Sequence, residues 1–137
     1  MNVEHRNIQK WIKKQYDHIY KTEAEIDGQV YLPSKKNHLY QPDVVLRDQQ
    51  GGNIKYIIEI ENDPVRKALI GASVLADYCV TIMNQMKKPR LIFIIYADSG
   101  IRQIPNFQKR LDVAKKYCKN LQSIDIYSED DFKKQKL

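Results

Sequence analysis

The sequence predicts a single mixed α/β domain in which helices pack against one sheet. Apolar residues recur at intervals of three and four in three segments, which is typical of amphipathic helices. Short runs rich in valine and isoleucine lie between these segments and favour strands. The chain has 137 residues, 42% of them hydrophobic, and no linker or change of composition divides it. We therefore expect one domain over residues 1–137 with the element order α-β-β-β-α-β-α-β.

The first predicted helix covers residues 4–22. Its apolar face consists of Ile8, Trp11, Ile12, Tyr16 and Ile19. We expect Trp11 to anchor this helix in the core. A short strand is predicted over residues 28–34, where Pro33 ends it before a polar loop.

Residues 42–61 are predicted to form a β-hairpin. Its first strand is residues 42–47 and its second is residues 53–61, both rich in valine or isoleucine. Gly51 and Gly52 lie between the two runs and mark the turn.

The period of the apolar residues becomes helical after residue 61. Asn62 or Asp63 can cap this helix, and Pro64 suits its first position. Several small residues would let the helix pack closely against a sheet. Residues 77–83 are β-prone, and we expect the helix to continue through them.

Three further elements complete the predicted order. Residues 89–97 form an apolar run that begins at a proline, which suits a strand buried on both faces. An amphipathic helix is predicted over residues 106–122 and a short strand over residues 123–128. The C-terminal residues 130–137 are expected to fray.

The charge of the chain favours an anionic partner. Twenty-three lysine and arginine residues against 17 aspartate and glutamate residues give a net charge of +6, which suits nucleic acid, an anionic membrane surface or an acidic protein without choosing among them. The apolar run at residues 91–97 is too short to span a bilayer, and the N-terminal residues lack the apolar stretch of a signal peptide. Cys79 and Cys118 show no metal-binding spacing. We expect a reduced, cytoplasmic protein without a membrane partner.

Three carboxylates, Asp43, Glu59 and Glu61, stand among the apolar residues of the predicted hairpin. Alternation along a strand places the two glutamates on one face. A two-residue turn puts Asp43 opposite Ile60, on the other face, whereas a longer loop or one bulge puts it opposite a glutamate. The glutamates either converge with Asp43 or lie on a solvated face opposite lysines such as Lys55.

Converging carboxylates would form an oxygen-rich site for a hard cation. Mg²⁺ (or Mn²⁺) prefers such ligands and commonly bridges a protein to a phosphate. The ion can polarise a phosphoryl oxygen and supply a water nucleophile. Lys67, in the first turns of the following helix, is placed to orient that water, and Arg66 to contact the phosphate.

The same residues resemble the PD-(D/E)xK nuclease superfamily. Pro42-Asp43 matches the "PD" of its motif, and Glu59-Ile60-Glu61 follows one hairpin later. The family core of a helix, a three-stranded meander, a helix and a further strand is similar to the order predicted for residues 4–97. The resemblance implies a restriction-endonuclease-like fold and a Mg²⁺-dependent nuclease acting on DNA, with a homodimer as one form in which it works.

By this resemblance, Asp43 and Glu59 correspond to the metal-binding pair of the family. Glu61 stands where the family has lysine, and some restriction enzymes of this fold use glutamate there as metal ligand or general base. Other members carry the lysine on the following helix, where Lys67 corresponds to it. An acidic residue of the first helix often assists in the family, and Glu4 is the candidate here.

Basic residues near the predicted site are expected to contact nucleic-acid phosphates. They are Lys35, Lys36, Arg66 and Lys67. The three histidines share no metal-binding spacing, so no histidine ligand is predicted.

Two functions remain open at this point. The first is a metal-dependent nuclease that hydrolyses phosphodiester bonds in DNA through Asp43, Glu59, Glu61 and Lys67. The second is a catalytically inactive module with the same fold that binds nucleic acid or protein. Only the first requires the three carboxylates to converge.

Overall fold

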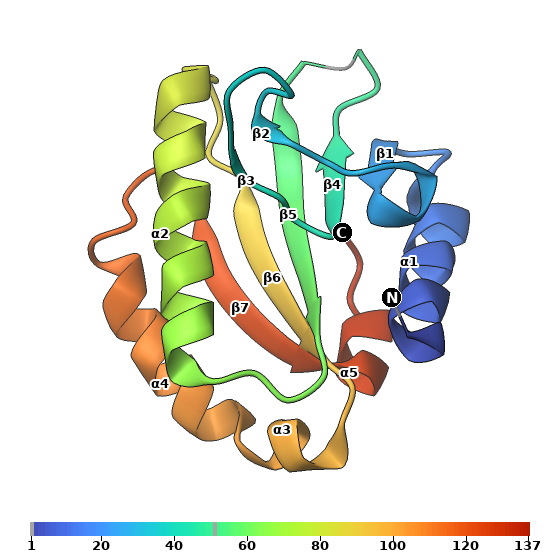
Figure 1. Cartoon of the computed structure of the whole chain (residues 1–137), viewed down its shortest axis with the longest axis vertical. Coiled ribbons are helices and arrows are strands. Elements are labelled where there is room, and N and C mark those ends of the chain that lie inside the picture. Colours follow the sequence, from blue (N-terminus) through green and yellow to red (C-terminus); the bar gives the residue numbers. More distant parts are fainter. Residues whose placement is uncertain (1, 51) are drawn as a thin grey trace.

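A five-stranded sheet forms the centre of the molecule in the computed structural model, which describes residues 2–50 and 52–137 (Figure 1). Its order is β1-β4-β5-β6-β7. The strands are β1 (Lys21–Ala24), β4 (Val44–Arg47), β5 (Ile54–Glu61), β6 (Arg90–Ile95) and β7 (Ser123–Ser128). The first three pair antiparallel, whereas β5, β6 and β7 pair parallel. The predicted mixed α/β class is confirmed.

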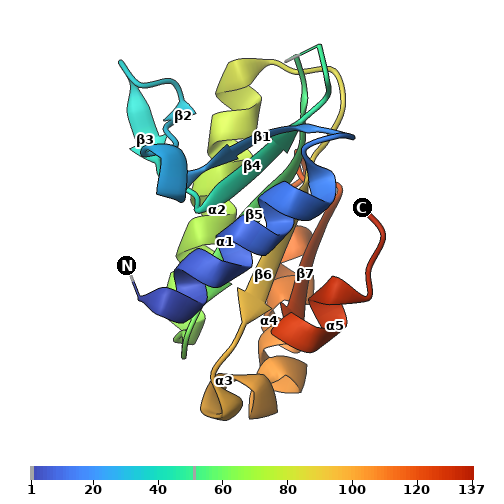
Figure 2. The same ribbon diagram turned by 90° about the vertical axis from the view of Figure 1, so that its right-hand side faces the viewer.

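Helices cover both faces of this sheet (Figure 2). One face carries α1 (Val3–Tyr16) and α5 (Glu129–Lys133), and the other carries α2 (Arg66–Met83) and α4 (Ile104–Lys115). The remaining elements are α3 (Asp98–Arg102), the 3-10 turn η1 (Glu25–Asp27), and the two strands of a small second sheet, β2 (Leu32–Pro33) and β3 (His38–Tyr40). This small sheet packs against α2.

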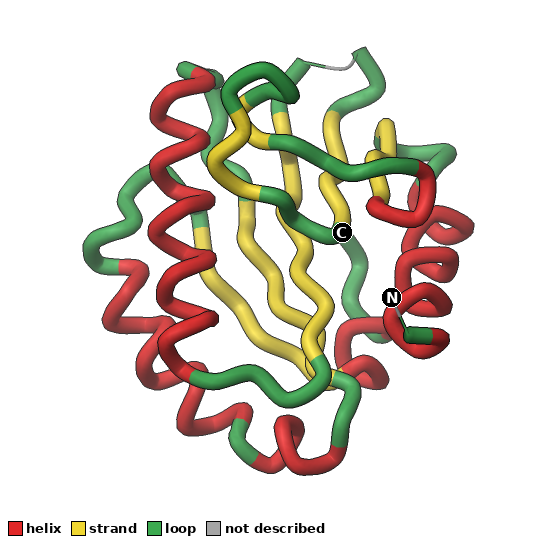
Figure 3. Tube along the Cα trace, viewed as in Figure 1, coloured by secondary structure: helices red, strands yellow, loops and turns green. Residues whose placement is uncertain are grey.

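The sheet separates two apolar cores, and β6 contributes to both. Leu91, Phe93 and Ile95 face α2 and α4, whereas Ile92 and Ile94 face α1 and α5. All five side chains are fully buried. The prediction of a strand buried on both faces is confirmed, because β6 lies between two parallel neighbours and under helices on each side. Figure 3 shows this central position of the strands.

The N-terminal segment differs from the prediction. The first helix ends at Tyr16 rather than continuing to residue 22, and residues 21–24 form the edge strand β1. Ile19, predicted on the apolar face, is 45% exposed. Pairing of β1 with β4 buries Ala24, so a long-range contact overrides the helical pattern. The strand predicted over residues 28–34 shrinks to the two residues of β2.

The helix after β5 begins later than its sequence suggests. Asn62, Asp63 and Pro64 precede it, and its N-cap is Val65, whose side chain makes no capping hydrogen bond. The predicted continuation through residues 77–83 is confirmed, because Cys79 and Val80 are buried in the core. Within the described part of the chain, no helix combines the length and the apolar character that crossing a bilayer requires.

The C-terminal segment is ordered, and the prediction that it frays is wrong. Ser128 caps α5 by accepting a hydrogen bond from the backbone N–H of Asp131 at 3.1 Å. Phe132 is fully buried, and its ring lies 6.1 Å from the partly buried ring of Trp11. The tail therefore closes the core beneath α1.

Replacing Phe132 with alanine tests this role. We expect Phe132→Ala to lower the free energy of unfolding by about 3–5 kcal/mol, because it leaves a cavity in the core under α1. Urea denaturation followed by circular dichroism measures the change. The matched control is Lys134→Ala on the same tail, where the exposed side chain should change stability by less than about 0.5 kcal/mol. Equal, small effects of both substitutions would contradict a structural role for the tail.

Candidate metal centre

The register of the β4–β5 hairpin brings Asp43 beside Glu59. Val44 pairs with Ile58, and Leu46 pairs with Tyr56. Arg47 then pairs with Ile54, which leaves Lys55 as an extra residue on β5. A bulge was one of the alternatives, besides a longer loop, under which Asp43 was predicted to meet a glutamate rather than Ile60.

The connecting loop fixes this register. The Asp48 carboxylate accepts hydrogen bonds from the backbone N–H groups of Gly52 at 2.9 Å and Asn53 at 3.2 Å. The backbone N–H of Asp48 also donates to the carbonyl of Asn53. Gly51, one of the two glycines predicted to mark the turn, lies outside the described residues.

Asp43 and Glu59 extend the strand pairing with their side chains. The backbone N–H of Asp43 donates to Oε1 of Glu59 at 3.0 Å, and the backbone N–H of Ile60 donates to Oδ2 of Asp43 at 2.7 Å. Asp43 is 8% exposed and Glu59 9%. A fully solvated sheet face is therefore excluded for Glu59.

The carboxyl end of β5 is anchored on its other side by the segment after β6. Tyr96 and Ala97 donate backbone hydrogen bonds to the carbonyls of Glu61 and Asn62. A Cβ at Gly100 would lie 2.9 Å from the Asn62 carbonyl oxygen and 2.7 Å from the side chain of Ile95. Glycine is thus required at position 100 for the chain to close over the end of β5.

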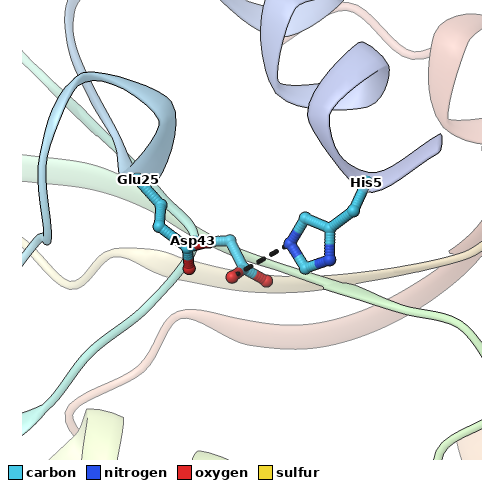
Figure 4. Close-up of side chains that lie close together, drawn as sticks. All are labelled: His5, Glu25 and Asp43. Atoms are coloured by element: carbon cyan, nitrogen blue, oxygen red, sulfur yellow. Dashed lines mark ion pairs between the residues drawn. The ribbon is translucent and has the colours of Figure 1, made fainter. Parts of the chain in front are cut away.

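Two residues that the sequence analysis missed complete the site: His5 and Glu25 (Figure 4). Nε2 of His5 lies 3.1 Å from Oδ1 of Asp43. One ligand atom from each of His5, Glu25 and Asp43 lies within 4.8 Å of the other two. The site therefore extends from the hairpin to α1 and η1.

Local hydrogen bonds hold these two residues in place. Asn2 caps α1 by accepting from the backbone N–H of His5 at 2.7 Å. The backbone N–H of Glu25 donates to the Asp43 carbonyl at 2.9 Å, and the backbone N–H of Ile26 donates to the side chain of Gln9 at 2.9 Å. Helix α1, η1 and the start of β4 are thereby tied together around the carboxylates.

The helical phase of α1 contains a signal for His5. His5 precedes the buried residues Ile8 and Ile12 by three and seven positions, which places it on the same face of the helix. Glu4, the predicted acidic residue of this helix, is exposed. Glu25 reaches Asp43 because Ala24 pairs with Val44, and the sequence alone does not reveal this pairing.

Burial and crowding of negative charge raise the pKa of three carboxyl groups in the site. The pKa of Glu59 lies well above its ordinary value because of burial and then the charge of Asp43. Burial and the Asp43 charge also raise the pKa of Glu61, and burial and a hydrogen bond with Asp43 raise that of Glu25. The hydrogen bond to Asp43 raises the pKa of His5. A cation in the site would relieve this repulsion.

The donor set fits a divalent cation. Carboxylate oxygens from Asp43 and Glu25 suit Mg²⁺ and Mn²⁺, and the imidazole of His5 is acceptable to Mn²⁺. Within the described residues, the predicted ligands Glu59 and Glu61 are not part of this group. Apart from its contact with Asp43, the buried Nε2 of His5 meets no hydrogen-bond partner within residues 2–50 and 52–137. An ion would therefore have to compete only with Asp43 for this nitrogen.

The predicted basic residues remain at the surface. Arg66 and Lys67 are exposed in the first turn of α2, and Lys35 and Lys36 are exposed between β2 and β3. Within the described residues, no ion pair joins any of these four to the carboxylates of the site. Lys35 lines a hollow of about 620 Å³ beside η1. The structure thus gathers the acidic residues more closely than the basic ones.

No protein-family model matches the sequence, and no curated protein or solved structure is significantly similar to it. The class defined by the fold and the site is a mixed α/β protein with a candidate metal centre rich in carboxylates. The chemistry of that centre is the basis for a functional proposal.

The raised pKa of Glu59 predicts how stability depends on pH in the metal-free protein. The unfolded carboxyl titrates near 4.5, whereas the folded one keeps its proton to higher pH. The folded state then binds more protons than the unfolded state, so stability falls as the pH rises above about 4.5.

Replacement of the Glu59 carboxyl with an amide should remove part of the loss of stability that occurs as the pH rises. We expect Glu59→Gln to raise the melting temperature at pH 7 by a few degrees, equivalent to about 1 kcal/mol, and to change it little at pH 4. Differential scanning calorimetry across pH 4–8 in EDTA measures both values. Glu4→Gln at an exposed position is the matched control, and a destabilised Glu59→Gln protein at pH 7 would contradict the prediction.

Proposed function

We propose that the protein is a metal-dependent nuclease that hydrolyses phosphodiester bonds in DNA. The observation that carries this proposal is the burial of Asp43 against Glu59, with Glu61, Glu25 and His5 beside them at the carboxyl end of β5. Buried carboxylates of raised pKa are common where a protein binds metal or performs acid–base chemistry. The net charge of +6 favours a polyanionic substrate.

The arrangement of the elements supports the same proposal. Helix α1 precedes three antiparallel strands, β1, β4 and β5, and helix α2 and strand β6 follow them. This order is similar to the restriction-endonuclease-like core of a helix, a meander, a helix and a further strand. The β2–β3 sheet then corresponds to an insertion before β4, and the elements from α3 to α5 are additions to the core.

The residues divide into ligands and proton carriers. Asp43 would hold the metal together with Glu25 and His5, which are grouped with it, and Glu59 and Glu61 are proposed as further ligands. A bound Mg²⁺ or Mn²⁺ would polarise a phosphoryl oxygen and lower the pKa of a coordinated water. Glu61 is half-buried and its pKa is raised by burial and by the Asp43 charge, which makes its carboxylate a stronger proton acceptor.

The exposed basic residues would position the nucleic acid. Arg66 and Lys67 begin α2, directly after the segment that follows Glu61. In this proposal Lys67 supports negative charge at the reacting phosphate, while Arg66, Lys35 and Lys36 contact the backbone on either side. Such contacts orient a strand without reading its sequence.

One observation favours a second candidate, a catalytically inactive module that binds nucleic acid or protein. Both oxygens of Asp43 already have partners, His5 at one and the backbone N–H of Ile60 at the other. Glu61 also stands where the resembling family has lysine. Binding of DNA without cleavage is the behaviour that this candidate requires.

Metal binding can be tested without a substrate. We expect Mn²⁺ or Mg²⁺ at about 100 times its Kd to stabilise the protein by about 2.7 kcal/mol, seen as a rise in melting temperature. Asp43→Asn and Glu59→Gln should each abolish most of this rise, because each removes a ligand charge. His5→Gln should weaken the response to Mn²⁺ more than that to Mg²⁺. An unchanged response in Asp43→Asn would contradict this metal site.

Cleavage separates the two candidate functions. Plasmid and single-stranded DNA are incubated with the protein and Mg²⁺ or Mn²⁺, and nicked or shortened products are resolved on gels. We expect cleavage that EDTA abolishes, that Asp43→Asn removes, and that Glu61→Gln slows by about 10²–10⁴-fold as the loss of a general base. Asp130→Asn, at an exposed position on α5, is the control and should keep full activity.

Two outcomes would contradict the nuclease. Activity that survives in Asp43→Asn assigns the cleavage to a contaminant or to another site. Retention of DNA by the wild-type protein in a gel-shift experiment, with no cleavage under any of these conditions, supports the binding module.

A further inference from the structure

Helix α2 is apolar on the side that faces away from the sheet. Residues 68–83 include a single charged side chain, Asp77, which accepts a hydrogen bond from the backbone N–H of Asn120 at 2.8 Å. The outward side chains include Val74 and Tyr78, which are 54% and 55% exposed. We define the α2 face as Gly71, Val74, Leu75, Tyr78 and Ile82. A helix that is apolar all round is normally buried, so a further surface is expected to cover this face.

A hollow of about 840 Å³ lies at the N-terminal end of the α2 face. It is lined by Val65, Arg66, Lys67, Ile70, Gly71 and Arg110. A Cβ at Gly71 would meet nothing within 4 Å. Glycine weakens a helix relative to alanine, and no contact within the described part of the chain explains its presence in the middle of α2. Close approach of another molecule at this point would explain it.

The α2 face is complementary to itself. Gly71 and Tyr78 are seven residues apart, so they lie on one side of the helix and are separated by about 10.5 Å along it. The midpoint between them falls at Val74 and Leu75. If two copies of α2 pack antiparallel about an axis through that midpoint, each Tyr78 ring enters the hollow beside Gly71 of the other copy. Each aromatic side chain then fills a space that is empty in the single chain.

The charges on α2 favour the same antiparallel pairing. Arg66 and Lys67 lie in its first turn, which has no acidic residue, and its last turn has no basic residue. Cations at a helix N-terminus oppose the helix dipole. Neither residue forms an ion pair within the described residues. An antiparallel partner would place them near the carbonyl end of its own α2, where cations are favourable.

We propose that the α2 face is the interface of a twofold symmetric homodimer, in which the two α2 helices pack antiparallel across Val74. A symmetric interface places each surface patch against its own copy, and the uncharged centre of this face allows that without repulsion. Val113 on the neighbouring α4 is 53% exposed, and Tyr117, just after that helix, is 79% exposed. The α2 face contains none of the carboxylates, so the dimer can be tested separately from cleavage. Arg66 and Lys67, which the nuclease proposal assigns to DNA, line the hollow that the partner's Tyr78 would enter.

Sedimentation equilibrium of the full chain, without metal or DNA, tests the proposal. We expect a mass of twice the 16.2 kDa of one chain at micromolar concentration. Val74→Glu should weaken association by about 100-fold or more, because two carboxylates would meet at the axis. The matched control is Ile19→Glu, which places the same charge at an apolar residue 45% exposed in the turn after α1. It should remain dimeric.

Two further variants separate the interface from an effect on folding. Gly71→Leu should weaken the dimer by filling the hollow, yet keep or raise the melting temperature measured at a concentration where the chains are monomeric. Val74→Cys should form a disulfide-linked dimer on oxidation, whereas Ile19→Cys should not.

Three results would overturn the proposal. The first is a wild-type chain that sediments as a monomer at 100 μM. The second is a Val74→Glu chain that remains dimeric, which places the interface elsewhere. The third is a dimer that forms only when DNA is added, which assigns the association to the nucleic acid. None of these bears on cleavage by the carboxylates, so failure of the dimer is distinguishable from failure of the nuclease.

Discussion

The site depends on one reciprocal pair of hydrogen bonds at the start of β4. Asp43 donates its backbone N–H to the Glu59 carboxylate, and the Asp43 carboxylate accepts the backbone N–H of Ile60. These bonds continue the ladder beyond the last paired residues of β4 and satisfy backbone groups that would otherwise be exposed at a strand edge. They also hold the Asp43 and Glu59 carboxylates next to each other, although two negative charges repel. The same contacts therefore form part of the sheet and create the electrostatic conflict at its edge.

The repulsion between these carboxylates persists within a well-packed fold. The strands beside the site bury fully apolar residues on both faces, while Asp43, Glu59 and Glu61 keep acidic groups there. Proteins accept such a cost at functional sites, where charges that destabilise the empty site become useful when a ligand arrives. Conversion of the Glu59 carboxyl to an amide is expected to stabilise the metal-free fold, because burial and the Asp43 charge oppose ionisation of Glu59.

Sequence reasoning predicted the strands of the hairpin and the parallel part of the sheet better than it predicted the edges. The apolar pattern was sufficient for β6, which has core elements on both faces, and for α2, whose buried side packs on the sheet. It was insufficient for β1, because residues 21–24 become a strand only by pairing with β4, about twenty residues further along. Phe132 was overlooked in a charged tail for a similar reason, since its burial depends on Trp11 at the other end of the chain. The bulge at Lys55 was anticipated only as one of several alternatives, because turn length and bulges have similar sequence requirements.

His5 and Glu25 illustrate the same limit within the site. The positions of His5 and Glu25 in the sequence match no metal-binding motif. The segments that supply His5, Glu25 and Asp43 meet only because α1 crosses the sheet beside η1. The sheet divides the molecule into two chemically different sides. The side of α1 supplies an imidazole and polar capping groups to the carboxylates, whereas α2 on the other side is nearly free of charge away from its first turn. A polyanion approaching the carboxylates would meet the basic residues that begin α2, while the apolar remainder of that helix has no role toward it. That separation is why the α2 face calls for a protein surface rather than nucleic acid as its partner.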